Sequence, residues 1–184
     1  MRDSDRTFEV RGTRVFTVPV EAAYAAWTES DLVQQWWGPH GFTCPVAEMD
    51  VRRGGVSLVA MRAPAEFGGA EIYNTWTYTF VDPPNRLDYD MRFSTSDRQT
   101  ISPADAGIPG GVPDAVPHIV TFERLDENRS QVSITEYGYT SAEARDMSQG
   151  GLDECLDKLS VLLNERAPTE SAKPRANPQQ RSSR

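Results

Sequence analysis

The sequence predicts an α+β fold in which a long C-terminal helix lies across a curved antiparallel β-sheet. Three observations support this prediction. One strand-like segment and two short helical segments come first, six strand-like segments follow, and one long amphipathic segment comes last. Strands in a run, with the helices segregated from them, are typical of α+β proteins. A long helix across a curved sheet leaves a space between the two layers, and this space is a candidate cavity.

The first forty residues predict one strand and two short helices. Residues 7–18 alternate polar and apolar side chains, as a strand with one buried face does. Pro19 opens a helix whose apolar side chains recur every three or four positions. A second helix runs from about residue 30 to Gly38-Pro39, where glycine provides a left-handed cap and proline cannot continue the helix.

Six further strands are predicted between residues 42 and 138. The clearest of them has large aromatic side chains at every second position from Trp76 to Phe80. The full set comprises residues 42–51, 56–62, 72–81, 87–93, 116–125 and 130–138. A loop from Ser94 to Pro117 interrupts the series, and a loop of this length inside a domain is usually functional or mobile.

The C-terminal part predicts one helix and a tail. Residues 141–166 place their leucines on one helical face, and we expect that face to pack on the sheet. Residues 167–184 are rich in Pro, Ser, Gln and Arg, and they carry too little apolar surface to offset the entropy cost of ordering. We therefore expect one domain over residues 1–166 and a disordered tail over residues 167–184.

The charge distribution argues against a nucleic-acid partner. The net charge is −8, divided into −11 for residues 1–166 and +3 for residues 167–184. Phosphate backbones are bound by clustered positive charge, which an acidic domain does not offer. The chain has no run of 18 apolar residues and no apolar stretch at its N-terminus. We therefore expect a soluble, cytoplasmic protein without a membrane span.

No motif for metal, cofactor or nucleophilic chemistry is present in the sequence. Cys44 and Cys155 lie far apart and form no Cys-x-x-Cys pair, so we expect two buried thiols. Two histidines are too few for a histidine-rich metal site, and the chain lacks a Gly-x-Ser-x-Gly motif and a phosphate loop. The sequence therefore predicts no metal, no cofactor and no catalytic residue. It favours a non-enzymatic role while leaving an enzyme open.

Several short motifs, in this order and spacing, resemble the bacterial family of homologues of the heat-shock ATPase activator. Among them are Trp36-Trp37-Gly38-Pro39 at the end of the second helix and Asp82-Pro83-Pro84 in a turn. The full set comprises residues 13–19, 25–28, 32–39, 50–55, 81–87, 106–122 and 157–159. The resemblance covers about residues 7–165. It implies the START-like fold of the SRPBCC superfamily, also called the helix-grip or birch-pollen-allergen fold.

Two residues depart from the pattern of this family. Phe80 stands where many relatives carry an acidic residue, and Leu152 stands where some carry tryptophan. Both changes are expected to make the cavity more apolar. They also argue against transferring acid-dependent chemistry from the relatives.

The candidate cavity takes its lining from the side chains predicted to face inward. A ligand site needs apolar walls and a few convergent polar groups. From the second helix and the strand that follows it, we expect Trp36, Trp37 and Phe42 to close one end. The sheet is expected to contribute Asn74, Trp76, Tyr78, Phe80, Tyr89, Met91, Phe93, His118, Val120, Phe122 and Glu136. The last helix is expected to add Met147, Leu152, Cys155 and Leu156.

Two of the inward positions carry a histidine and a glutamate. His118 and Glu136 share the apolar parity of their strands, and a buried histidine or glutamate is costly unless it is paired. Three interpretations stay open. The two side chains orient a ligand, they form an acid–base pair, or they lie at strand ends and reach water at the rim.

The function predicted from sequence is binding of an apolar, lipid-like or aromatic small molecule. Two alternatives on the same fold are an aromatase/cyclase- or hydrolase-type enzyme and a module that regulates a chaperone ATPase. The chaperone alternative is weak, because the family name comes from one domain of a larger co-chaperone. The partner expected is thus a small molecule, with a homodimer left open. Fold does not decide between these functions, and the identity of the ligand cannot be read from the sequence.

Overall fold

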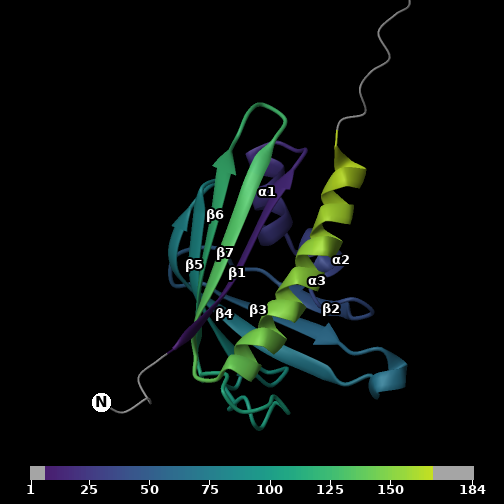
Figure 1. The fold of residues 1–184 in the computed structure, drawn as a ribbon, viewed down its shortest axis with the longest axis vertical. Coiled ribbons are helices and arrows are strands. Elements are labelled where there is room, and N and C mark those ends of the chain that lie inside the picture. Colours follow the sequence, from purple (N-terminus) through teal and green to yellow (C-terminus); the bar gives the residue numbers. More distant parts are fainter. Residues whose placement is uncertain (1–6, 168–184) are drawn as a thin grey trace, which may run out of the picture.

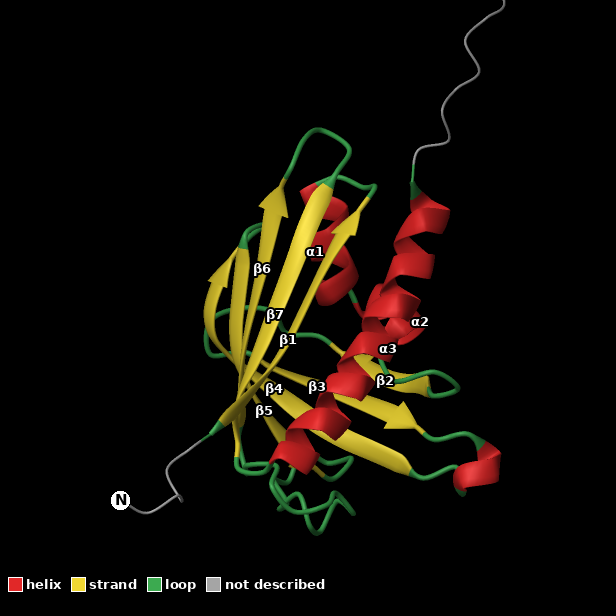
Figure 2. Ribbon diagram, in the orientation of Figure 1, coloured by secondary structure: helices red, strands yellow, loops and turns green. Residues whose placement is uncertain are grey.

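The computed structural model describes residues 7–167, which form a sheet and three α-helices (Figures 1 and 2). In chain order the elements are β1 (Phe8–Phe16), α1 (Val20–Thr28), α2 (Ser30–Trp36), β2 (Thr43–Glu48), β3 (Val56–Arg62), the 3-10 helix η2 (Ala65–Phe67), β4 (Glu71–Asp82), β5 (Arg86–Ser94), β6 (Val116–Arg124), β7 (Ser130–Tyr139) and α3 (Ala142–Arg166). The predicted α+β class and the order of strands and helices are confirmed. The tail predicted from residue 167 onward lies, apart from its first residue, outside the described residues.

The seven strands form one antiparallel sheet in the order β1-β7-β6-β5-β4-β3-β2. The sheet curves strongly, so that β2, β3 and β4 cross behind the end of α3 while β1, β6 and β7 run alongside it (Figure 1). Helices α1 and α2 lie on the same side of the sheet as α3, at the end away from the β3–β4 hairpin (Figure 2). The concave face of the sheet is therefore filled by helices at one end.

Helix α3 packs closely on β1 at Gly12. A Cβ atom at this position would lie 2.6 Å from Leu156 Cδ1 and 3.2 Å from Leu152 Cδ2. Glycine thus allows the helix to approach the strand, which is one recognised use of glycine in a strand interior. The N-terminus of the helix is capped by Ser141, whose Oγ accepts a hydrogen bond from the Ala144 amide at 3.1 Å.

A β-bulge in β4 changes which side chains face inward. Tyr78 pairs with Tyr89, but Phe80 pairs with Asp88, so β4 holds one extra residue at this point. Phe80 is 46% exposed, whereas the next residue, Val81, packs against the core. The prediction that Phe80 lines the cavity is therefore wrong, because strict alternation does not hold across an inserted residue. Phe80 therefore does not make the cavity more apolar.

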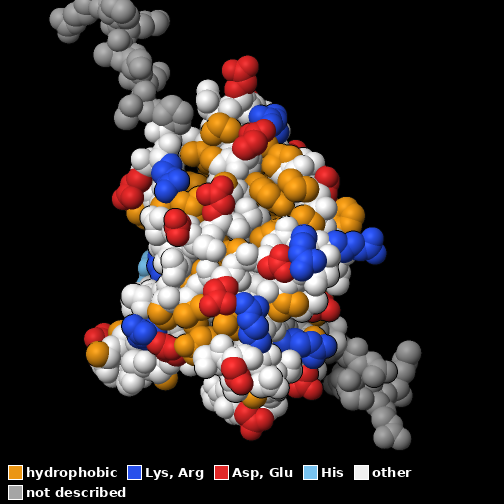
Figure 3. All heavy atoms as spheres, turned by 180° about the vertical axis from the view of Figure 1, so that it is seen from behind, with side chains coloured by type: hydrophobic (Ala, Val, Ile, Leu, Met, Phe, Trp, Pro, Cys, Tyr) orange, Lys and Arg blue, Asp and Glu red, His pale blue; other side chains and the backbone are white. Residues whose placement is uncertain are grey.

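The surface carries charges of both signs. On the face seen in Figure 3, acidic and basic side chains are interspersed among hydrophobic ones and do not separate into two regions. None of the helices in the described part of the chain has the length and apolar character needed to cross a membrane.

Candidate functional site

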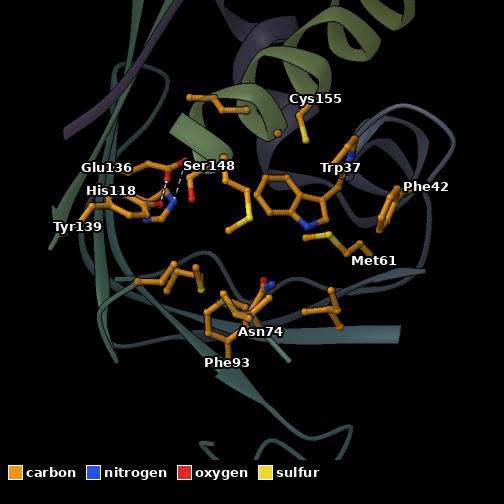
Figure 4. Close-up of a pocket in the computed structure, with 18 residues that line it drawn as sticks. Trp37, Phe42, Met61, Asn74, Phe93, His118, Glu136, Tyr139, Ser148 and Cys155 are labelled. Carbon is orange, nitrogen blue, oxygen red and sulfur yellow. Dashed lines mark hydrogen bonds and ion pairs between the residues drawn. The ribbon is translucent and has the colours of Figure 1, made fainter. Parts of the chain in front are cut away.

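A cavity of about 260 Å³ lies between the sheet and the N-terminal half of α3 (Figure 4). Its walls come from β3 to β7, from α3, from the segment after α2 and from the loop of residues 95–115. The lining residues are Trp37, Pro39, Phe42, Met61, Ile72, Asn74, Met91, Phe93, Ile108, Val112, His118, Glu136, Tyr139, Met147, Ser148, Gly151, Leu152 and Cys155. Most of them are apolar, and the polar groups gather at few points.

Ten of the predicted residues line the cavity. They are Trp37, Phe42, Asn74, Met91, Phe93, His118, Glu136, Met147, Leu152 and Cys155. Met147 is also 46% exposed, so it lies where the cavity meets the surface. These positions place the ten residues around one space.

Seven other predicted residues face inward but belong to the packed core. They are Trp36, Trp76, Tyr78, Tyr89, Val120, Phe122 and Leu156, all at most 4% exposed. For the five residues on the sheet, the reason is that α1 and α2 fill part of the concave face, whereas Leu156 of α3 packs at Gly12 of β1. Phe122, for example, packs edge-on against Tyr24 and Trp27 of α1, with ring centroids 5.2 and 6.0 Å apart. Alternation predicts which face a side chain occupies, but it does not predict where along the strand the helices cover that face.

The adjacent residues Trp36 and Trp37 lie in different environments. Trp36 is fully buried, and its Nε1–H donates a hydrogen bond to Ala26 O at 2.8 Å. Trp37 lies at the cavity wall and packs edge-on against Trp76, with ring centroids 4.8 Å apart. Its Nε1 is buried and has no hydrogen-bond partner among the described residues. Trp36 is the last residue of α2 and Trp37 is its C-cap with an extended backbone, so the two side chains point in different directions.

Several lining residues were missed by sequence reasoning. Ile72 shares the parity of Asn74, so alternation could have included it. Ile108 and Val112 are apolar residues within the long loop, and a loop has no periodicity from which to infer their direction. Tyr139 ends β7 after a register shift in its pairing with β1, so alternation does not predict its direction. Ser148 lies in α3 four residues before Leu152, so helical spacing could have included it.

The loop of residues 95–115 is attached on both sides of the cavity. Arg98 donates a hydrogen bond to Val56 O at 2.9 Å and forms an ion pair with Glu48, which ties the loop to β2 and β3. At the other end the Thr140 amide donates to Gly111 O at 2.9 Å. These attachments hold the apolar part of the loop against the cavity.

Lys158 fixes the segment that follows α2. Its Nζ donates hydrogen bonds to Gly38 O at 2.9 Å and to Phe42 O at 3.0 Å. Burial lowers the pKa of this lysine. One cation on α3 therefore holds the segment that carries Pro39 and Phe42 in the cavity wall.

His118 and Glu136 form a buried pair at one end of the cavity. His118 Nε2 lies 3.5 Å from Glu136 Oε1, and the side chains are 3% and 11% exposed. His118 Nδ1 lies 2.8 Å from Val116 O, and the Tyr139 hydroxyl donates to Glu136 Oε2. The ring of His118 stacks on Tyr89, with centroids 4.7 Å apart and an interplanar angle of 17°. The interpretation that the two residues lie at strand ends and reach water is therefore wrong.

Asn74 provides a second polar point in the cavity. Its Oδ1 accepts a hydrogen bond from Trp76 Nε1 at 3.0 Å, which fixes the amide group. The tip of the side chain points toward the space between Trp37 and Phe93 (Figure 4). The cavity thus has apolar walls and separated polar groups, as small-molecule sites do.

Both cysteines are free and buried, and we expect both to react slowly. Burial raises the pKa of the Cys44 thiol to about 11 and that of Cys155, in the cavity wall, to about 12. A thiol reacts as its thiolate, so alkylation by iodoacetamide at pH 8 should be about 10²- to 10³-fold slower than for a free cysteine. The rate should rise as the pH approaches 11.

Mass spectrometry of the alkylated peptides measures both rates. The same protein in guanidinium chloride is the control, and both cysteines should then react at the rate of a free thiol. Fast alkylation of the folded protein at neutral pH would contradict the burial of these thiols.

Comparison with known proteins identifies the family of this fold and site. The family described as Activator of Hsp90 ATPase homolog 1-like protein matches residues 17–164. The chain belongs to this family. Membership agrees with the START-like resemblance of the sequence motifs. No group of three or more His, Cys, Asp or Glu side chains within residues 7–167 is arranged to hold a metal ion.

Solved structures of similar proteins show the same fold. A protein from Chromobacterium violaceum is 25% identical, with a TM-score of 0.68 over 84% of this chain and 96% of that chain. The AHSA1 protein from Silicibacter pomeroyi is 19% identical, with a TM-score of 0.69 over 86% of this chain and 99% of that chain. A protein from Staphylococcus epidermidis is 24% identical, with a TM-score of 0.67 over 90% and 94%. Among curated proteins, the comparison found no match.

Proposed function

We propose that the protein binds a small, mainly apolar organic molecule in the cavity between the sheet and α3. The observation that carries this proposal is the cavity itself, which has apolar walls and only a few polar side chains. Its volume of about 260 Å³ exceeds the roughly 150 Å³ that accommodates benzene in an engineered apolar cavity. It lies just below the range of about 300–1,000 Å³ for drug-sized ligands. A ligand with one or two rings, or a short aliphatic chain, fits this size.

An enzyme acting on such a ligand is the second candidate. Its support is the His118–Glu136 pair, because a buried histidine and carboxylate beside a cavity can exchange a proton with a bound molecule. The chaperone-regulating alternative has less support. An exposed apolar patch would support it, and the large hydrophobic side chains that are exposed within residues 7–167 belong to five different elements and loops: Val15, Phe67, Phe80, Leu125, Met147 and Val161.

Filling the cavity from Gly151 tests the proposal. Gly151 lines the cavity from α3, and a Cβ at this position would meet only Pro39 Cγ within 4 Å, at 3.9 Å. Gly151→Leu should therefore place its side chain in the cavity and weaken the binding of naphthalene at least about tenfold. Stability should not fall, because replacing a glycine inside a helix contributes about 0.5–1 kcal/mol.

Gly150→Leu is the matched control. Gly150 is the preceding residue of the same helix, is exposed, and has nothing within 4 Å of the position of a Cβ. This variant should bind naphthalene as the unmodified protein does, measured by the fluorescence of the ligand. Native mass spectrometry of the purified protein should also show a co-purified small molecule that Gly151→Leu has lost. Equal binding by both variants would show that the ligand lies elsewhere.

A further inference from the structure

We propose that the end of the cavity formed by His118, Glu136 and Tyr139 binds a hydroxyl group, so that the ligand is an apolar molecule carrying a phenol, an enol or an alcohol. This inference rests on the proposed binding function and makes the chemistry of the ligand more specific. At this polar end, Nε2 of His118 and Oε1 of Glu136 face each other 3.5 Å apart (Figure 4).

The hydrogen bonds around His118 determine where its protons lie. Nδ1 is 2.8 Å from Val116 O, and a carbonyl oxygen can only accept a hydrogen bond. Nδ1 therefore carries a hydrogen and donates it. The remaining ring nitrogen, Nε2, faces Glu136 Oε1, so at least one proton must lie between these two atoms to avoid two opposed lone pairs.

The distance between the two atoms is too long for a good hydrogen bond. They are 3.5 Å apart, whereas N–H···O bonds in proteins are about 2.7–3.2 Å long. The other carboxylate oxygen of Glu136 is occupied by the Tyr139 hydroxyl. Burial and the charge of Glu136 raise the pKa of Tyr139, so this hydroxyl stays protonated and remains a donor. The Ser148 hydroxyl lies beside that of Tyr139 at the same end (Figure 4). Nε2 and Oε1 are thus the atoms of the His118–Glu136 pair that a ligand can satisfy.

A ligand hydroxyl group can form hydrogen bonds with Nε2 of His118 and Oε1 of Glu136 at the same time. Its oxygen can accept the proton held by one of the two atoms while its own hydrogen is donated to the other, with about 2.8 Å to each atom. An ether or ketone can only accept, so it leaves the carboxylate without a donor. A hydrocarbon satisfies neither group, and a buried polar atom without a partner costs binding free energy.

The stacking of His118 on Tyr89 makes this end rigid before a ligand binds. Tyr89 is itself stacked on Trp76, with centroids 4.9 Å apart and an interplanar angle of 18°. The three rings form a column within the core, and His118 is 3% exposed. A preorganised site loses little side-chain entropy on binding. A ligand with a hydroxyl group and the corresponding ether should therefore differ in affinity.

Three matched compounds test the inference with the unmodified protein. Naphthalene, 2-methoxynaphthalene and 2-naphthol share the same rings, and we expect 2-naphthol to bind at least about tenfold more tightly than the ether. The chain has only two histidines, so protein labelled with ¹⁵N-histidine gives signals from His40 and His118 alone. Addition of 2-naphthol should shift the Nε2 signal of His118 and leave that of the exposed His40 in place.

Glu136→Gln separates this end from the rest of the cavity. The amide keeps the shape of the side chain but removes the charge that accepts the hydroxyl hydrogen. The preference for 2-naphthol over its ether should then fall to about twofold. If the variant does not fold, the three compounds with the unmodified protein decide the matter. Equal affinity for 2-naphthol and its ether would overturn the inference and leave the proposed function intact. Binding of none of the compounds would overturn both.

Discussion

Trp36→Ala is expected to lower the free energy of unfolding by about 3–5 kcal/mol. Trp36 is fully buried, packs on Trp27 with ring centroids 4.6 Å apart, and donates a hydrogen bond to Ala26 O. Alanine would leave a large cavity and a carbonyl oxygen without its donor. The cost of the cavity and the cost of the unpaired carbonyl oxygen add, because neighbouring core groups relax only in part.

Trp37→Ala is the matched comparison for this substitution. Trp37 lies at the cavity wall, where its Nε1 has no partner among the described residues, so its removal should cost clearly less stability. It should instead weaken naphthalene binding, which Trp36→Ala in a folded sample should affect less. Equilibrium unfolding in urea measures the two stabilities. Equal losses for both variants would refute the division into a core residue and a cavity residue.

Gly111→Ala is expected to cost about 2–4 kcal/mol. Gly111 has φ +104°, a conformation that favours glycine, and a Cβ at this position would lie 2.3 Å from Ser141 Oγ and 2.9 Å from Ala144 Cβ. The clash falls on the N-cap of α3 and on the hydrogen bond from Thr140 to Gly111 O. Strained backbone and overpacking each contribute about 1–3 kcal/mol.

Gly110→Ala controls for the loss of a loop glycine. Nothing lies within 4 Å of the position of a Cβ at Gly110, so its substitution should change stability by no more than about 0.5 kcal/mol. Hydrogen exchange of the Thr140 amide provides a local measurement, since only Gly111→Ala should accelerate it. If Gly111→Ala is as stable as the control, the loop is not fixed to α3 as the structure shows.

The site was predictable in part, and the limits have identifiable causes. Alternation along the strands correctly placed Asn74, Met91, His118 and Glu136 on the inner face, because successive side chains in a strand point to opposite sides. It failed at Phe80, where a β-bulge adds one residue to β4. The one sign of the bulge in the sequence is the adjacent apolar pair Phe80-Val81, which interrupts the alternation of polar and apolar residues.

Which of the inward-facing residues reach the cavity depends on packing between distant elements. Tyr78, Tyr89 and Phe122 have the inward direction that the sequence predicts, yet all three are enclosed in the core. Whether such a residue reaches the cavity depends on where α1 and α2 lie on the sheet. That position results from many contacts between residues far apart in the chain, and no local period reports it.

The sequence by itself determined the α+β class, the order of the elements and the family, because these follow from local periodicity and from motifs in a defined order. It also placed the polar residues of β6 and β7 on the inner face. Only the tertiary structure decided that Nε2 of His118 and Oε1 of Glu136 face each other across 3.5 Å. It also decided that Val116 O is the hydrogen-bond partner of His118 Nδ1 and that the Tyr139 hydroxyl is the partner of Glu136 Oε2. Their mutual geometry arises from the pairing of β6 with β7 and the stacking on β5, which are long-range contacts that a single sequence does not display.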